Sequence, residues 1–371
     1  MHKIITQGSS SGSPRTVVLG AGIMGRLMAW QLARRGHHVS VFEAGGPDAQ
    51  SSPARVAAAM LAPMAESAIT EPPVVDMGLY ALSRWPELLS ELEQPVFFQR
   101  QGTLLLWHRQ DAAEAQRFAR IMQTTHDKHP ALQAAQHLDL ADVQALEPSL
   151  EGRFAQGLYL PGEGQLDNRE LMAALLQALQ TLGVEMHWHT PQSPDNFSPG
   201  QHGQPDWVLD CRGLGAKGSL PLRGIRGEVA RIQAPDVHLS RPTRLIHPRY
   251  PIYIAPKPDH LFVIGATEIE SNDTSPPSVR SALELLSAAY SVHPGFGEGR
   301  ILEIATQVRP TLPDNLPAVR WLSPRCLQIN GLYRHGFMIS PALLDVALEL
   351  MEGASPLARR FALDEARADM V

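Results

Sequence analysis

The sequence predicts an α/β protein in which an open parallel sheet, flanked by helices, is interrupted by an inserted domain built on an antiparallel sheet. Three observations support this fold class. A strand, a glycine turn, a helix and a second strand follow one another over residues 16–43, and a strand at residues 207–211 runs into another glycine turn. Between and after these units, short segments alternate apolar and polar residues, as half-buried antiparallel strands do.

The first unit reads TVVLGAGIMGRLMAWQLARRGHHVSVFE. Its glycines, Gly20, Gly22 and Gly25, follow a short apolar strand with the spacing G-x-G-x-x-G. They permit a tight turn, the approach of a pyrophosphate to the backbone, and close packing of helix on strand. Glu43 ends the second strand, where a carboxylate can accept hydrogen bonds from a ribose. The unit predicts a Rossmann-like dinucleotide site but does not distinguish FAD from NAD.

The remaining elements follow from apolar periodicity, helix caps and glycine stops. We expect helices over residues 74–92, 111–126, 139–146, 169–182, 277–292 and 341–351. We expect a pair of strands within residues 94–107 and further strands at 157–160, 184–189, 207–211, 229–232, 253–255, 261–266, 301–308 and 327–330. Asp167 or Asn168 can cap the helix at 169–182, whereas no capping box is evident at 139–146.

Composition excludes several classes of protein. The 371 residues suit two domains, and 44% hydrophobic with 19% charged residues is typical of a soluble globular protein. The net charge of −6 offers no basic surface for nucleic acid, and no apolar run is long enough to cross a membrane. Residues 1–13 lack a signal-peptide core and indicate a flexible tail. Two cysteines, Cys211 and Cys326, are too few for a disulfide framework or a zinc site. We therefore expect a protein of the reducing cytoplasm without a structural metal.

Four stretches carry a resemblance to a known family. They are GAGIMG with VFEAG, AAAMLAP, RGLGA with IRGE, and QVRPTLPDNLP with NGLYRHGFMISPA. On these motifs the chain resembles the D-amino-acid-oxidase-like flavoproteins, and within them the glycine oxidases of thiamine biosynthesis. The last pair of stretches is the most specific, because an NAD-type Rossmann protein has no reason to carry it. The resemblance covers nearly all of the chain after the tail.

The resemblance implies a Rossmann-like FAD-binding domain of the D-amino-acid-oxidase (DAO) type with an inserted antiparallel-sheet substrate domain. The FAD-binding domain would comprise residues 14–92, 140–222 and 300–371, and the substrate domain residues 93–139 and 223–299. It also implies FAD held without a covalent bond. The residues that would contact it are Gly20, Gly22, Ile23, Met24, Gly25, Glu43, Ala44, Ala58, Ala59, Met60, Gln192, Gly213, Leu332, Tyr333, Arg334, His335, Gly336, Phe337 and Met338.

The resemblance further implies the substrate contacts. Arg309 would grip a substrate carboxylate, since a guanidinium is planar, binds both oxygens and stays charged. Tyr253 would hydrogen-bond the same carboxylate, and Arg334 would be a second active-site arginine beside the flavin. Glu268 departs from the family, because glycine oxidases carry a methionine near the substrate there. Its carboxylate would either favour a second cationic group on the substrate or pair with Arg334 or Arg309.

The implied activity is oxidative deamination of a small amino acid or amine of the glycine, sarcosine or D-amino-acid class. Hydride would pass to flavin N5, water would hydrolyse the imino acid to an oxo acid and ammonia, and oxygen would reoxidise the flavin to give hydrogen peroxide. Three alternatives stay open: a dehydrogenase with another electron acceptor, a flavoprotein that modifies a partner protein during cofactor maturation, and an NAD-dependent dehydrogenase. Homo-oligomers and a protein partner are also left open, whereas nucleic acid and membranes are not expected as partners.

Overall fold

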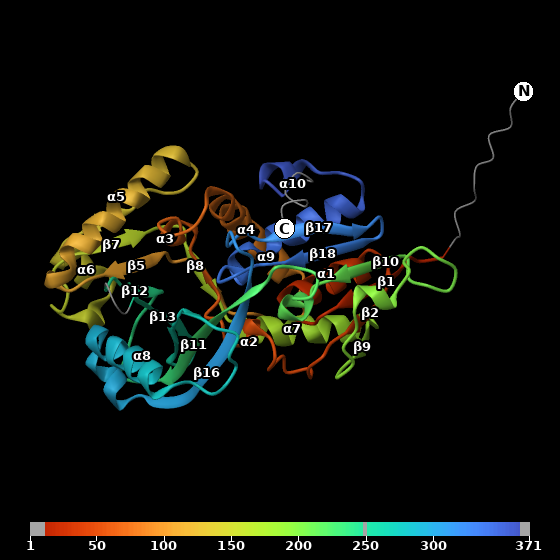
Figure 1. Ribbon diagram of the computed structural model, residues 1–371. Coiled ribbons are helices and arrows are strands. Elements are labelled where there is room, and N and C mark those ends of the chain that lie inside the picture. The colour runs from red at the N-terminus through yellow and green to blue at the C-terminus, as the bar shows by residue number, and fades with distance from the viewer. Residues whose placement is uncertain (1–11, 248–250, 364–371) are drawn as a thin grey trace, which may run out of the picture.

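The computed structural model describes residues 12–247 and 251–363. The expected tail at residues 1–13 falls almost wholly outside this range. Figure 1 shows two parts side by side, each built around its own large sheet. Among the described residues, no helix is both long and apolar enough to span a membrane.

The first part contains a six-stranded sheet in the order β17-β18-β10-β1-β2-β9. The pairs from β18 to β9 are parallel, and only β17 runs antiparallel to its neighbour. Segments far apart in the sequence therefore alternate in one sheet, which confirms the predicted open, Rossmann-like architecture. The strands are β1 (Arg15–Leu19), β2 (His38–Phe42), β9 (Glu185–His187), β10 (Trp207–Asp210), β17 (Ala318–Ser323) and β18 (Cys326–Asn330).

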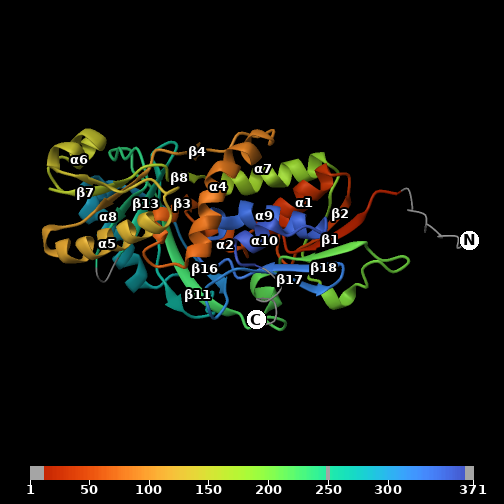
Figure 2. The same cartoon turned by 90° about the horizontal axis from the view of Figure 1, so that it is seen from above.

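Helices cover one face of this sheet, as Figure 2 shows for α1, α7 and α9. They are α1 (Ile23–Arg34), α4 (Pro72–Ser90), α7 (Asn168–Thr181), α9 (Gly336–Met351) and α10 (Pro356–Arg360). Leu27, Trp30, Trp85 and Leu343 belong to the core that these helices share, and each is at most 2% exposed. Burial of such side chains contributes about 1.5–3 kcal/mol each, so packing fixes α1 against the sheet. Asp167 caps α7 as expected, since its Oδ1 accepts from the N–H groups of the first turn.

The second part is a nine-stranded sheet in the order β15-β11-β14-β13-β12-β5-β7-β6, with β16 on the other side of β11. All of its pairs are antiparallel except β12 with β5. The inserted antiparallel sheet is thereby confirmed. Its strands are β5 (Thr103–Leu106), β6 (Gln136–Leu138), β7 (Gly157–Leu160), β11 (Arg223–Gln233), β12 (Thr243–Leu245), β13 (Ile252–Lys257), β14 (Leu261–Gly265), β15 (Ile269–Glu270) and β16 (Arg300–Thr311).

Two helices cover opposite faces of the second sheet. Leu105 of β5 packs with α5 (Ala112–Lys128), whereas Leu104 and Leu106 pack in the cluster that contains α8 (Val279–Val292). Successive strand residues point to opposite faces, which explains this division. Short elements connect the two parts. They are α2 (Pro53–Val56), β3 (Met60–Leu61), α3 (Pro63–Glu66), β4 (Phe98–Gln99) and β8 (Gly164–Leu166), whereas α6 (Leu140–Leu146) packs within the second part.

Some details differ from the expectations. The two strands expected as a pair within residues 94–107 do not pair with each other, because β4 joins β8 and β5 joins β7. A capping box does begin α6, since Asp139 and Asp142 exchange side chain-to-backbone hydrogen bonds. β7 and β16 lie in segments expected to belong to the FAD-binding domain, yet they pair within the second sheet. The division into domains given above stays a proposal.

Candidate active site

A cavity of about 1030 Å³ lies between the two parts of the molecule. One end is at the first turn of α1, where it is lined by Gly22, Ile23 and Met24. The other end is lined by side chains of the second sheet, including Tyr253 and Arg309. Ligand pockets commonly measure roughly 300–1,000 Å³, so this cavity can hold a large cofactor and a small substrate together.

The glycine turn fits a dinucleotide pyrophosphate. Gly20 has φ of +93°, and a Cβ there would lie 2.6 Å from the carbonyl oxygen of Cys211. A Cβ at Gly25 would lie 1.8 Å from the Gly20 carbonyl oxygen, so only glycine lets α1 approach β1 this closely. Gly22 is the N-cap of α1 and offers no side chain to the free N–H groups of the first turn. Those groups can therefore bind an anion at the end of the cavity.

Glu43 lies beside the glycine turn, as expected for a ribose-binding carboxylate. Its oxygens accept hydrogen bonds from the N–H groups of Ala21 (2.6 Å) and Gly45 (2.7 Å). Gln192 lies farther along the chain after β9, and its carbonyl accepts a bond of 3.3 Å from Arg212. The described lining of the large cavity begins at Gly22 and includes none of Glu43, Ala44 and Gln192. Gly20 and Gly25 are absent from this lining as well, so these five expected cofactor contacts stay predictions.

The residues expected to contact the flavin come together around the middle of the cavity. Its lining includes Gly213, Ala58, Ala59, Met60 and all seven residues from 332 to 338. Lys257, which was not expected from the sequence, holds part of this lining in place through hydrogen bonds to its backbone. Lys257 is 6% exposed, and its Nζ donates to the carbonyl oxygens of Ala58 (3.0 Å) and Leu166 (2.6 Å). Burial lowers the pKa of Lys257 to about 7.

Arg309 and Tyr253 both line the cavity from strands of the second sheet. Arg309 donates only long hydrogen bonds, of 3.3 and 3.4 Å, to the carbonyl oxygen of Thr267. No carboxylate of the described residues forms an ion pair with it. Burial lowers the pKa of Arg309 and raises that of Tyr253. The guanidinium lies against Gly227, where a Cβ would come within 2.3 Å of Nη2, so the glycine leaves room for it.

Of the two arginines considered as partners for Glu268, the structure shows Arg334. The distance from Arg334 Nη1 to Glu268 Oε2 is 2.9 Å, and the Tyr333 hydroxyl also donates to this carboxylate. The side chain of Glu268 is 47% exposed and lines the cavity, so the pair is in partial contact with solvent.

Glu66 and Arg244 were not identified from the sequence. Glu66 is 8% exposed and lies 2.5 Å from Nη2 of Arg244 and 3.1 Å from Nε of Arg334. Burial opposes its ionisation, but these two guanidinium groups hold the pKa of Glu66 well below its usual range. The neighbouring His335 is buried, which lowers its pKa to about 4 and leaves it neutral at pH 7. The available signal for Glu66 was a single charge inside the largely apolar stretch LAPMAESAI, whereas no comparable signal marks Arg244.

The arginines that line the cavity differ in whether they have a carboxylate partner. Arg244, Arg309 and Arg334 face Glu66 and Glu268, while His335 is neutral. Both carboxylates are engaged by Arg244 and Arg334. Arg309 has no carboxylate within ion-pair distance among the described residues, so a ligand with one carboxylate could neutralise it.

Comparison with known proteins identifies the family. The family model described as "DAO: FAD dependent oxidoreductase" matches residues 15–347. The chain belongs to this family. A protein named thiamine biosynthesis oxidoreductase ThiO in Rhizobium etli is 40% identical over 339 residues, covering 91% of this chain and 96% of the relative. A glycine oxidase of Geobacillus kaustophilus is 26% identical over 369 residues, covering 90% of this chain and 92% of the relative.

Solved structures share the fold of this DAO family member. A crystal structure of glycine oxidase from Geobacillus kaustophilus matches with a TM-score of 0.76 at 24% identity, covering 95% of this chain and 99% of that one. Iminodiacetate oxidase from Chelativorans sp. matches with a TM-score of 0.77 at 21% identity, covering 93% and 98%. The chain is therefore an FAD-dependent oxidoreductase of the glycine oxidase type, and the alternative of an NAD-dependent dehydrogenase is set aside.

Proposed function

We propose that this enzyme oxidises a small amino acid or amine that carries one carboxylate. The observation that supports this most directly is Arg309, a half-buried cation that lines the cavity without a carboxylate partner among the described residues. The names of the relatives, which include glycine oxidase, support the same substrate class. Glycine, sarcosine and small D-amino acids all carry one carboxylate and one amine.

We assign the cofactor contacts from the fit described above. The glycine turn and the start of α1 would hold the pyrophosphate of FAD, Glu43 and Ala44 the ribose, and Gln192 the adenine side. The flavin would lie between Ala58, Ala59 and Met60 on one side and Gly213 with residues 332–338 on the other. When bound without a covalent link, FAD would accept hydride from the substrate carbon and pass the electrons to oxygen.

The chain's own residues would bind and orient the substrate. The two Nη groups of Arg309 can donate to both oxygens of a carboxylate, and the Tyr253 hydroxyl can donate a further hydrogen bond. Fixing the carboxylate at one end restricts where the amine and the α-carbon lie, and such orientation lowers the barrier without a strong base. The imino acid product would then hydrolyse in water to an oxo acid and ammonia, or methylamine where the substrate is sarcosine.

Glu268 would restrict the substrate further. Its negative charge faces the same end of the cavity as the carboxylate site, and Arg334 is already paired with it. A substrate with a second carboxylate would meet this charge, so we expect monocarboxylates to be preferred over compounds such as iminodiacetate.

The first experiment tests for substrate and acceptor together. Yellow holoenzyme is mixed without oxygen with glycine, sarcosine and small D-amino acids, and flavin absorbance is followed. We expect one of them to bleach the flavin, and air to restore the colour with formation of hydrogen peroxide. Recovery only with a quinone or a carrier protein would identify a dehydrogenase instead. A flavin that no small amine bleaches would contradict the proposal and favour a protein partner as substrate.

The Arg309→Met variant tests the carboxylate contact. Loss of hydrogen bonds to a charged group costs about 1.5–3 kcal/mol, so KM should rise about 10- to 100-fold. Arg309→Lys should fall between wild type and Arg309→Met, because it keeps the charge but loses the planar fork. Arg223→Gln is the matched control, since Arg223 forms a surface ion pair with Glu270. An unchanged KM in Arg309→Met would rule out this arginine as the carboxylate site.

A further inference from the structure

Two charged residues of β11 lie buried behind the cavity wall without lining the cavity. Gly227 and Val229 line the cavity, whereas Arg226 and Glu228 occupy the alternate positions of the same strand. Alternate strand residues point to opposite faces, so neither charge reaches the ligand. Their side chains are 6% and 1% exposed, and Nε of Arg226 donates to Oε1 of Glu228 over 2.9 Å. A buried pair of this kind is weak evidence for a gain in stability, because desolvation of the two charges offsets their attraction, and its contacts indicate a further role.

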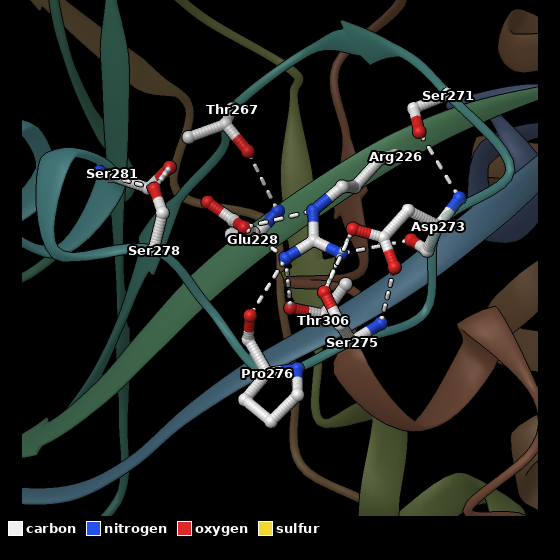
Figure 3. A network of polar contacts seen from close by, with 10 residues as sticks. All are labelled: Arg226, Glu228, Thr267, Ser271, Asp273, Ser275, Pro276, Ser278, Ser281 and Thr306. Atoms are coloured by element: carbon white, nitrogen blue, oxygen red, sulfur yellow. Dashed lines mark hydrogen bonds and ion pairs between the residues drawn. The ribbon is translucent and has the colours of Figure 1, made fainter.

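Arg226 ties β11 to the loop that leads into α8 (Figure 3). Its guanidinium donates to the carbonyl oxygens of Asp273 (2.8 Å) and Pro276 (3.0 Å), and to the Thr306 hydroxyl (3.3 Å). It also forms an ion pair of 3.2 Å with the Asp273 carboxylate. One side chain thus fixes the loop at several points between β15 and α8.

Glu228 connects this arginine to the substrate end of the cavity. Its N–H donates to the Thr267 hydroxyl over 2.9 Å, and the N–H of Thr267 donates back to the Glu228 carbonyl over 3.2 Å. The carbonyl of Thr267 accepts the hydrogen bonds of Arg309. Glu268, the next residue, carries the carboxylate that faces the cavity.

We infer that Arg226 and Glu228 are positioning residues that fix the Arg309 guanidinium for carboxylate binding through Thr267. This inference rests on the proposed role of Arg309. The pair joins β11 to the loop before α8. We expect this connection to keep the carbonyl of Thr267, which lies between the two, in a fixed position. Without the pair, Thr267 and Glu268 can shift, and Arg309 loses the acceptor that orients it.

The test measures carboxylate binding directly, with acetate as the probe and the flavin spectrum of the holoenzyme as the readout. Arg226→Gln should weaken acetate binding about tenfold or more and raise KM for the amino acid, while kcat changes much less. Arg226→Lys should recover part of the affinity, since it keeps the charge. Glu228→Gln, which retains the backbone bonds to Thr267, should give a smaller loss and serves if Arg226→Gln fails to fold.

A double variant separates positioning from general damage to the fold. In the Arg309→Met background, Arg226→Gln should cause no further loss of acetate affinity, because its effect passes through Arg309. The control Arg223→Gln, on the same strand, should bind acetate as the wild type does. Unchanged acetate affinity in Arg226→Gln, or an equal loss in both backgrounds, would overturn the inference. Failure of every amine to bleach the flavin would overturn the proposed oxidation alone, since acetate binding needs no turnover.

Discussion

Glu66 and Glu163 are two buried carboxylates whose pKa values are shifted in opposite directions. Glu66 lies between two guanidinium groups and stays ionised. Glu163 is 1% exposed, and one of its oxygens accepts a 2.8 Å hydrogen bond from the N–H of Ala65. Burial, without a paired cation, raises the pKa of Glu163 to about 7. Local partners rather than depth decide which of the two is charged at pH 7.

The pH dependence of stability should depend on Glu163. Its native pKa lies above its unfolded value, so the stability it contributes is present below pH 4.5 and lost as pH rises through about 7. Glu163→Gln cannot ionise, and it should gain up to about 3 kcal/mol relative to wild type between pH 4.5 and pH 8. Urea unfolding of the holoprotein at several pH values measures this difference. Glu87→Gln, which alters an exposed residue, is the control, and parallel pH profiles for Glu163→Gln and wild type would contradict the prediction.

Sequence motifs led to some residues of the site and not to others. Arg309, Tyr253 and Arg334 were expected because each lies in a stretch with a family resemblance, and all three line the cavity. Glu66 and Arg244 were missed because their contact joins residues 178 positions apart. A motif within a short stretch of sequence cannot predict a contact between residues so far apart, so the structure was needed to find it.

At the scale of elements, the turn between β1 and α1 was the most predictable feature. Most of the contacts that require glycine in this turn lie within a few residues, whereas the pairing of a strand depends on partners far away in the sequence. β16 illustrates the difference: its alternation predicted a strand, but only the ladder with β11 places it in the second sheet. The same holds for β4 and β5, which are adjacent in sequence but belong to different sheets.

The glycines of this turn should respond differently to substitution. Gly25→Ala places a Cβ 1.8 Å from a backbone oxygen, so α1 must move away from β1, and we expect the protein to lose its fold or its FAD. Gly22→Ala meets only the Ser52 hydroxyl oxygen, at 3.2 Å, which a side-chain rotation can relieve. It should fold normally yet bind FAD more weakly, because the added methyl group enters the cavity. Thermal unfolding and FAD titration of both variants test this, and equal FAD affinity in Gly22→Ala and wild type would refute it.

At the scale of the whole molecule, the cavity is formed by both sheets together. Residues 22–24 and 332–338 approach it from the first part, and β11, β13 and β16 from the second. The sequence predicted two sheets and an insertion, but not how the sheets meet, because that depends on the packing of many side chains at once. A ligand that fills the cavity contacts both parts and should hold them together.

FAD should therefore stabilise the whole protein. A ligand that binds only the native state adds about 2.7 kcal/mol at a free concentration of 100 times its Kd. We expect the melting temperature of the apoprotein to rise with FAD, and to rise less with FMN, which lacks the part that reaches the glycine turn. Calorimetry with each flavin at equal concentration measures the two shifts. Equal shifts for FAD and FMN would mean that the glycine turn contributes no binding.

The two cysteines are free and buried, and Cys211 lines the cavity next to the glycine turn. Burial raises the pKa of both thiols, to about 11 for Cys326 and higher still for Cys211. Peroxide attacks the thiolate rather than the thiol, so at neutral pH neither sulfur offers a reactive form. If oxygen reoxidises the flavin as proposed, hydrogen peroxide forms inside the structure at every turnover. The protonated thiols would let this enzyme survive many such cycles before oxidative self-inactivation.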